Sequence, residues 1–275
     1  MLLQLLFLAI ALVVLFVFFG LIERLWPSIP SQRRFRRGLT TDITWFFWDP
    51  LVNRPVTVFT VAVFAVLVAV IAGAGMSGSA IRAWLDRETI FNSQPPWLQA
   101  IQLIVLVDLI GYWSHRFFHE VGVLWRIHAV HHSSETLDWL SSVRVHPLNE
   151  IGQRMAQALP FLLLGYSPGL LAAVVPLLTL YAIGLHANVS WDFGPLRKVI
   201  ASPRFHRWHH TSELEGLDKN YSGLLPVWDI LFRTYYMPVG RVPAEFGVLG
   251  ETVPEGLFRQ LLYPLRRRPS AAVRG

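Results

Sequence analysis

Three long apolar stretches constrain the fold of this chain more than any other feature. Residues 1–22 are almost uninterruptedly apolar, and residues 55–75 and 97–114 form two further stretches. Such runs are typical of bilayer-spanning helices, because a helix satisfies its backbone polar groups inside hydrocarbon. A cleaved signal peptide fits residues 1–22 poorly, since no basic region precedes the run and no small-residue cleavage site comes after it. We therefore expect three membrane spans.

The composition supports a membrane protein and excludes several kinds of site. Apolar residues make up 53% of the chain and charged residues 15%, and the chain contains no cysteine. Disulfides, thiolate metal sites and cysteine nucleophiles are thereby excluded. The net charge is +6, but the densest basic runs, residues 33–37 and 265–269, lie close to apolar stretches. This pattern indicates membrane topology and contact with anionic lipid, so we expect no nucleic-acid partner and place residues 33–37 in the cytoplasm.

The rest of the chain predicts a helical hairpin and a polar cap. Residues 152–188 form an apolar block that is broken at residues 165–169, and residues 76–96 read as an outer loop with a short helix. We predict an all-α integral membrane bundle of about three spans plus the hairpin, so about four to five transmembrane helices, with a cytoplasmic helical cap. The expected divisions are an N-terminal transmembrane region (1–96), a catalytic region (97–237) and a C-terminal cytoplasmic tail (238–275).

The histidines are strongly clustered. All ten lie between residues 115 and 210, and eight of them form three boxes, HRFFH, HAVHH and HRWHH. Within the boxes the spacing is i, i+4 or i, i+3, i+4, which predicts that the side chains of each box share one helix face. The eight box residues are His115, His119, His128, His131, His132, His206, His209 and His210.

Metal binding explains this pattern better than packing does. A lone histidine pair more often packs or caps a helix, but two triplets and a pair on one side of the membrane favour ligation. Eight imidazoles overfill one first-row ion and suit two. Imidazole alone does not choose among zinc, copper, iron and nickel. Bis-histidine haem needs one deep histidine on each of two facing helices, which doubled histidines do not match.

Several residues outside the boxes are candidates for the same site. His186 follows the second arm of the hairpin on the side of the boxes, so we expect it to be a ligand. His146 stands in a loop before Pro147 and could be a ligand, a partner of a ligand or a plain loop residue. Ligating histidines normally donate their second ring N–H to a carboxylate or an amide oxygen. The candidates for that role are Glu120, Asp138, Glu150, Asn188 and Asp229.

With these motifs in view, the chain resembles the fatty acid hydroxylase / sterol desaturase superfamily of integral membrane di-iron oxygenases. The resemblance covers about residues 97–237. Small departures are NYS where NYG is usual and LFRT where LFGT is usual. The matching motifs are HRFFHE (115–120), HAVHHSS (128–134), RVHPLNE (144–150), HANVSW (186–191), PRFHRWHH (203–210), NYS (220–222) and WDILFRT (228–234).

The resemblance implies a ligand set and a reaction. The eight box histidines match the family's metal ligands, His186 matches a further ligand position and His146 a recurring His-Pro. By this resemblance we expect two iron ions, O2 as co-substrate, no catalytic side chain beyond the ligands, and hydroxylation or desaturation of a lipid C–H bond. Electrons would come from a ferredoxin, a cytochrome b5 or a reductase, at the cytoplasmic face of what we expect to be a bacterial inner membrane.

Alternatives remain open from the residues alone. A zinc-dependent membrane hydrolase and a non-catalytic metal- or lipid-binding membrane protein would both use histidine ligands. The substrate, whether a fatty acyl chain, a sterol or another lipid, cannot be read from the ligands, and neither can the oligomeric state.

Overall fold

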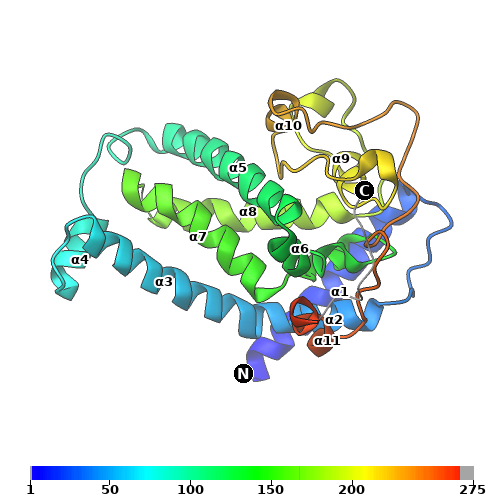
Figure 1. The fold of residues 1–275 in the computed structure, drawn as a ribbon, viewed down its shortest axis with the longest axis horizontal. Helices are drawn as coiled ribbons and strands as arrows, with labels where there is room; N and C mark the ends of the chain where they lie inside the picture. Colours follow the sequence, from blue (N-terminus) through cyan, green and yellow to red (C-terminus); the bar gives the residue numbers. More distant parts are fainter. Residues whose placement is uncertain (1, 167, 267–275) are drawn as a thin grey trace.

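The computed structural model describes residues 2–166 and 168–266, and its regular elements are helices (Figure 1). In these residues the β-type pairings are two isolated bridges, Pro27 with Val189 and Thr211 with Phe246. The predicted all-α fold is therefore confirmed. The α-helices are α1 (Leu2–Leu25), α2 (Leu39–Trp48), α3 (Arg54–Ile71), α4 (Gly78–Leu85), α5 (Pro96–Glu120), α6 (Gly122–His128), α7 (Pro147–Leu164), α8 (Pro168–His186), α9 (Pro203–His209), α10 (Val227–Leu231) and α11 (Leu257–Leu261).

Shorter helical turns connect these elements. A π-helical segment, η1, joins α2 to α3. In the described part of the chain, four 3-10 segments lie between α-helices, and the last one comes directly after α11. These segments are η1 (Asp49–Asn53), η2 (His131–Ser133), η3 (Trp139–Val143), η4 (Gly194–Lys198), η5 (Leu214–Gly216) and η6 (Tyr263–Leu265).

Within residues 2–166 and 168–266, three helices are long and apolar enough to cross a membrane, which agrees with the three predicted spans. They are α1, α5 and a continuous helix over Leu39–Ile71 that joins α2, η1 and α3. The second of these is longer than the expected span at 55–75, because its first turns continue beyond the apolar stretch. The π-helical segment lies where Pro50 and Pro55 cannot donate backbone hydrogen bonds, so a widened turn accommodates them without ending the helix. The short helix expected in the outer loop is α4.

The predicted hairpin is formed by α7 and α8. Pro147 and Pro168 stand at the first positions of the two helices, where a missing N–H costs nothing. Gly165 ends α7 with φ of 75°, and a Cβ there would lie 2.5 Å from Cγ2 of Thr89. Only glycine tolerates both the left-handed backbone and this close approach. Ser167, inside the expected break at 165–169, lies outside the described residues.

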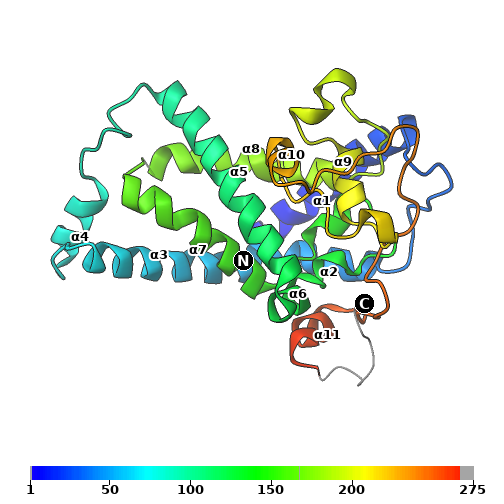
Figure 2. The same cartoon turned by 45° about the horizontal axis from the view of Figure 1, so that its top comes forward.

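The helices place the histidine boxes at one end of the molecule. α7 packs against α3 and α5, α5 contacts α6, and α8 contacts α9. In both views α4 and the turn between α7 and α8 lie at one end, whereas α6, α9 and α10 lie at the other (Figures 1 and 2). The apolar spans therefore lead to a polar, histidine-bearing end.

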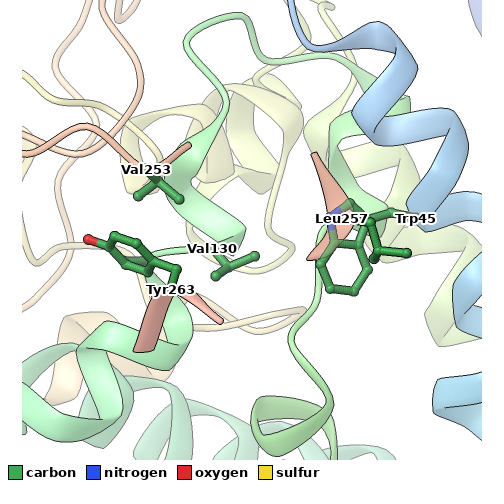
Figure 3. Close-up of a cluster of buried hydrophobic side chains, with 6 residues drawn as sticks. Trp45, Val130, Val253, Leu257 and Tyr263 are labelled. Carbon is green, nitrogen blue, oxygen red and sulfur yellow. The ribbon is translucent and has the colours of Figure 1, made fainter. Parts of the chain in front are cut away.

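A buried apolar cluster fixes the chain around the second box. Val130, between the histidines of HAVHH, packs with Trp45 of α2 and with Val253, Leu257 and Tyr263 of the C-terminal segment (Figure 3). Residues 238–266 are thus folded against the helices, whereas residues 267–275 of the expected C-terminal tail, including the end of the basic run 265–269, lie outside the described residues. Segments far apart in sequence meet here to hold a short stretch of the site.

A buried ion network ties α2 to the loop that comes after the second box. Asp42 is fully buried and pairs with Arg36 at 2.7 Å and with Arg144, which is also fully buried. Arg36 pairs in addition with Asp138 at 2.6 Å. Removing one partner from such a network leaves an uncompensated buried charge, which costs about 3–5 kcal/mol.

We expect Asp42→Ala to destabilise the protein by about 3–5 kcal/mol, because the buried guanidiniums of Arg36 and Arg144 lose the carboxylate they share, and Glu255, 3.5 Å from Arg144, is a poorer partner. Thermal unfolding of the detergent-solubilised protein measures the effect. Thr44→Ala is the control, since Thr44 lies on the exposed face of the same helix and bonds the Thr40 carbonyl. Equal melting temperatures for the two variants would contradict the role given to Asp42.

Candidate metal centre

Nine of the ten histidines gather into two adjacent groups. In each group the ligand atoms lie within 4.8 Å of one another. The rings of His132 and His210, one from each group, stack with centroids 4.3 Å apart, so the groups adjoin. The five-histidine group consists of His115, His119, His128, His132 and His209, and the four-histidine group consists of His131, His186, His206 and His210.

The two triplets are shared between the groups in a reciprocal way. HAVHH contributes His128 and His132 to the five-histidine group and His131 to the four-histidine group. HRWHH contributes His206 and His210 to the four-histidine group and His209 to the five-histidine group. In each triplet the residues at i and i+4 stay together and the residue at i+3 leaves. A shared helix face therefore does not keep the three residues of a triplet in one group. α6 ends at His128, and the chain turns before η2, so His131 and His132 diverge.

Backbone carbonyls fix the tautomer of several rings. Nδ1 of His115 donates to the Tyr221 carbonyl at 2.8 Å, and Nδ1 of His209 donates to the Lys219 carbonyl at 2.8 Å. In the other group, His186 donates to the carbonyl of Ala182 at 2.8 Å. A carbonyl only accepts, so Nδ1 carries the proton in each ring. The Nε2 lone pair of each ring is then free to bind a metal.

These lone pairs point at one another. Nε2 of His115 lies 3.0 Å from Nε2 of His128, and Nε2 of His186 lies 3.2 Å from that of His131 and 3.1 Å from that of His206. Nitrogen lone pairs at this distance repel unless a cation or a proton lies between them. The residues therefore fit bound metal ions, one in each group.

Burial supports the same conclusion. Nε2 of His132 and Nε2 of His209 are buried and have no hydrogen-bond partner in the described structure. A buried polar atom without a partner is unfavourable, so each is expected to bind something that the protein itself does not provide. Among the described residues, both groups consist of imidazoles alone, and such a donor set suits iron, zinc, copper or nickel.

The site keeps its rings neutral. Burial, reinforced by the neighbouring rings, lowers the pKa of His132 and of His206 well below the ordinary 6.5. The same causes act on His209 and His210, whose pKa values are also well below 6.5. Neutral imidazole is the form that binds metal, so these rings are already in the protonation state that a metal ligand needs.

One loop orients three rings of the five-histidine group. Residues 218–221 supply the Lys219 and Tyr221 carbonyls and a carboxylate oxygen of Asp218, to which Nδ1 of His119 donates at 3.1 Å. The loop is held in turn by Asp229, which accepts from the Tyr221 and Ser222 amides at 2.8 and 2.9 Å. Its position sets the direction of the rings.

A buried carboxylate in α5 holds the continuation of the same loop. Asp108 accepts from the amides of Leu224 and Leu225, both at 2.8 Å. These two hydrogen bonds explain why an ionisable residue lies inside an apolar span, because the Asp108 carboxylate anchors backbone N–H groups of the loop.

The RVHPLNE segment orients the second box. The carbonyl of Arg144 accepts from Nδ1 of His131 at 3.3 Å, and the side-chain oxygen of Asn149 accepts from Nδ1 of His128 at 2.9 Å. His146 itself lies outside both groups. Its Nδ1 accepts from the Leu148 amide at the start of α7, and its Nε2 donates to the Leu261 carbonyl. Of the three roles left open for His146, these contacts fit the plain loop residue, because both ring nitrogens are bonded elsewhere.

The five candidates for orienting the ligands form hydrogen bonds and ion pairs with groups other than the histidine rings. Glu120 pairs with Arg116 on the surface, and Glu150 pairs with Arg154. Asp138 caps η3 and pairs with Arg36, while Asn188 bonds the backbone of Ile29. In each case a nearer basic group or backbone amide competes successfully. Asp229 bonds backbone amides too, but those amides belong to the loop that orients the rings.

Asp218 and Asn149 contact ligand rings, and the sequence patterns did not select them. Asn149 stands inside the RVHPLNE motif, directly before the candidate Glu150, so the motif was a usable signal. Asp218 lies in a polar loop at φ of 54°. No periodicity marks such a position, and the contact depends on how the loop folds back onto α5.

Comparisons with known proteins agree with this arrangement. The fatty acid hydroxylase family profile matches residues 100–234. The chain is 33% identical to the ornithine lipid hydroxylase OlsE of Rhizobium tropici over 182 residues, which is 62% of this chain and 53% of the relative. It is 34% identical to the alkylglycerol monooxygenase of Danio rerio over 152 residues, 55% of this chain and 32% of the relative. It is 36% identical to the human alkylglycerol monooxygenase over 129 residues, 47% and 28% respectively.

The similarity covers only part of each relative. The matched region spans about half the length of the rhizobial relative and about a third or less of the animal ones. No solved structure matches the chain.

We expect Asn149→Leu to weaken metal binding about 10–100-fold, because His128 loses the acceptor that fixes its tautomer and direction. Competition with a chelator measures the affinity. Glu150→Gln is the matched control, since its carboxylate pairs with Arg154 and not with a ring. A control variant that lost as much affinity as Asn149→Leu would contradict this division of roles.

Bound metal should be lost on acidification. In the unfolded chain the rings take up protons as the pH falls below about 6.5, whereas burial keeps the pKa of His131 and of His132 well below that value in the fold. The unfolded state therefore binds more protons, and the folded, metal-bound state loses stability as the pH falls. We expect metal content to hold from about pH 8 to about pH 6.5 and to fall towards pH 5. A constant content over the whole range, measured by elemental analysis after dialysis, would contradict the ligand assignment.

Proposed function

Because this chain belongs to the fatty acid hydroxylase family through residues 100–234, we propose that it is a membrane-bound di-iron oxygenase that hydroxylates a C–H bond of a lipid. The observation that supports the proposal is the pair of adjoining histidine groups with converging Nε2 lone pairs. Two irons held there would activate O2 for insertion into a C–H bond. The metal ligands in this proposal are the nine histidines of the two groups, and residues 97–237 form the catalytic region.

The overall reaction needs two electrons from outside. Hydroxylation consumes the lipid, O2, two electrons and two protons, and yields the alcohol and water. The chain has no cysteine pair that could deliver two electrons as a dithiol, so a ferredoxin, a cytochrome b5 or a reductase would supply them. The donor would approach from the cytoplasmic side, to which the basic loop at residues 33–37 is assigned by the positive-inside rule.

The residues around the site contribute position and exclusion of water. Carbonyls and the side-chain oxygen of Asn149 hold the rings by Nδ1, and burial of the groups would keep solvent from metals bound at Nε2. α5 is apolar over most of its length and carries two of the proposed ligands in its last turns, so it would join the bilayer directly to the centre. A lipid chain could reach the metals sideways from the membrane without passing through water.

The relatives point to the class of substrate. One is described as an ornithine lipid hydroxylase and others as alkylglycerol monooxygenases. Both names describe lipids with a polar headgroup and a long chain. We propose that this chain also acts on a membrane lipid of that kind, in a bacterial inner membrane.

His131→Ala tests the proposal. This ring belongs to the four-histidine group, so we expect the variant to lose metal and all hydroxylated lipid. The measurement combines iron analysis of the purified protein with mass spectrometry of lipids from cells that express it, seeking a gain of one oxygen.

His146→Ala is the matched control, because His146 caps α7 and touches neither group. It should retain two irons per chain and the product. If the purified protein contained zinc in place of iron and consumed no O2, the result would favour a hydrolase and would contradict the oxygenase proposal. An intact two-metal His131→Ala protein would do the same.

A further inference from the structure

A polar cleft of about 440 Å³ lies where α1 ends, and the proposed function does not yet use it. Three arginines line it, Arg24 at the end of α1 and Arg33 and Arg34 in the loop after it. The cleft also contains the carboxylates of Glu23 and Asp138. Positive groups outnumber negative ones, so the cleft favours an anion.

The carboxylates in the cleft are engaged with other groups. Asp138 pairs with Arg36, which lies outside the lining, and Glu23 accepts from the backbone amides of Asn188 and Trp139. By contrast, neither Arg24 nor Arg33 forms an ion pair with any residue in 2–166 or 168–266. Their guanidinium groups can donate to a ligand from outside, and guanidinium groups match the oxygens of phosphate and carboxylate.

The cleft lies at the boundary of the bilayer. The first apolar span ends at Leu25, and Trp26 comes next, with its ring 5.6 Å from that of Trp191. Phe35, in the same loop as the arginines, is 81% exposed. Tryptophan rings and arginines at the end of a span are typical of the headgroup region.

A short chain of hydrogen bonds joins the cleft to the metal centre. Gln32, in the cleft, donates to the Leu137 carbonyl at 3.0 Å, and Arg207 donates to the same oxygen at 2.9 Å. Arg207 lies between His206 and His209 in the third box. One layer of residues therefore separates the cleft from the ligands.

We propose that this cleft binds the anionic headgroup, phosphate or carboxylate, of the lipid whose chain reaches the metals. The claim that the bound lipid is the substrate rests on the proposed function, whereas the binding itself does not. The competing explanation is that the arginines only set membrane topology, which requires no particular lipid.

The double variant Arg24→Gln/Arg33→Gln tests the proposal, because both side chains are exposed and form no ion pair within the described structure. Native mass spectrometry of the full chain in detergent measures retained lipid, with phosphatidylglycerol, phosphatidylcholine and oleic acid as probes. We expect the wild-type protein to retain an anionic probe over phosphatidylcholine, and the double variant to retain it about tenfold less. Preference for phosphatidylglycerol would identify a phosphate ligand, and preference for oleic acid a carboxylate; both support the cleft.

Arg37→Gln is the matched control. Arg37 belongs to the same basic loop, is 74% exposed and pairs with Glu135 outside the cleft. Retention should be unchanged in this variant. Three outcomes would overturn the proposal. They are an equal loss of retained lipid in the control and the double variant, no loss in either variant, and equal retention of the anionic and zwitterionic probes by the wild-type protein. Metal content and O2 consumption of the same preparations report separately on the oxygenase proposal, so the failure of one does not hide the other.

Discussion

Mutual repulsion between nitrogen lone pairs is the interaction on which the rest of this structure depends. At 3.0–3.2 Å, the Nε2 atoms of His115, His128, His131 and His186 face partners of the same kind inside a buried site. The rings cannot turn to relieve this, because carbonyls and an amide hold their Nδ1 protons. A bound cation would convert the repulsion into ligation. The fold therefore holds an arrangement that a bound cation would make favourable.

Much of the polar end of the molecule serves to hold these rings. α5 carries His115 and His119 of the five-histidine group on a single helix, and loop 218–221 accepts hydrogen bonds from both rings. The RVHPLNE segment does the same for the second box, while its arginine is bound by Asp42 of α2. The apolar spans, the ion network and the metal centre are thus one connected system. The arginine cleft at the end of α1 joins it through the Leu137 carbonyl.

Sequence patterns predicted the parts of this system that have a local cause. Apolar length identified three spans, and the Gly–Pro break identified the hairpin, because both depend on the nearest residues alone. The bunching of histidines identified the set that the structure gathers into two groups. It also suggested His146, which stands in the right motif but uses both nitrogens to cap α7 and bond Leu261.

The division of ligands between the groups was beyond such reasoning. The i, i+3, i+4 offsets do not say which residues share a group. His131 joins the group that contains His206 and His210, and His209 joins the group that contains His128 and His132. Partners such as Asp218 and the Lys219 carbonyl come from a loop far from the rings of α5 in sequence. Their contacts depend on tertiary folding, which leaves no periodic trace.

Anomalous diffraction from crystals of the iron-loaded protein, recorded at the iron edge, tests most directly whether the two histidine groups hold two metal ions. We expect two peaks in each chain, one among the nitrogens of the five-histidine group and one among those of the four-histidine group. A single peak, no peak, or peaks away from both groups would contradict the two-metal centre.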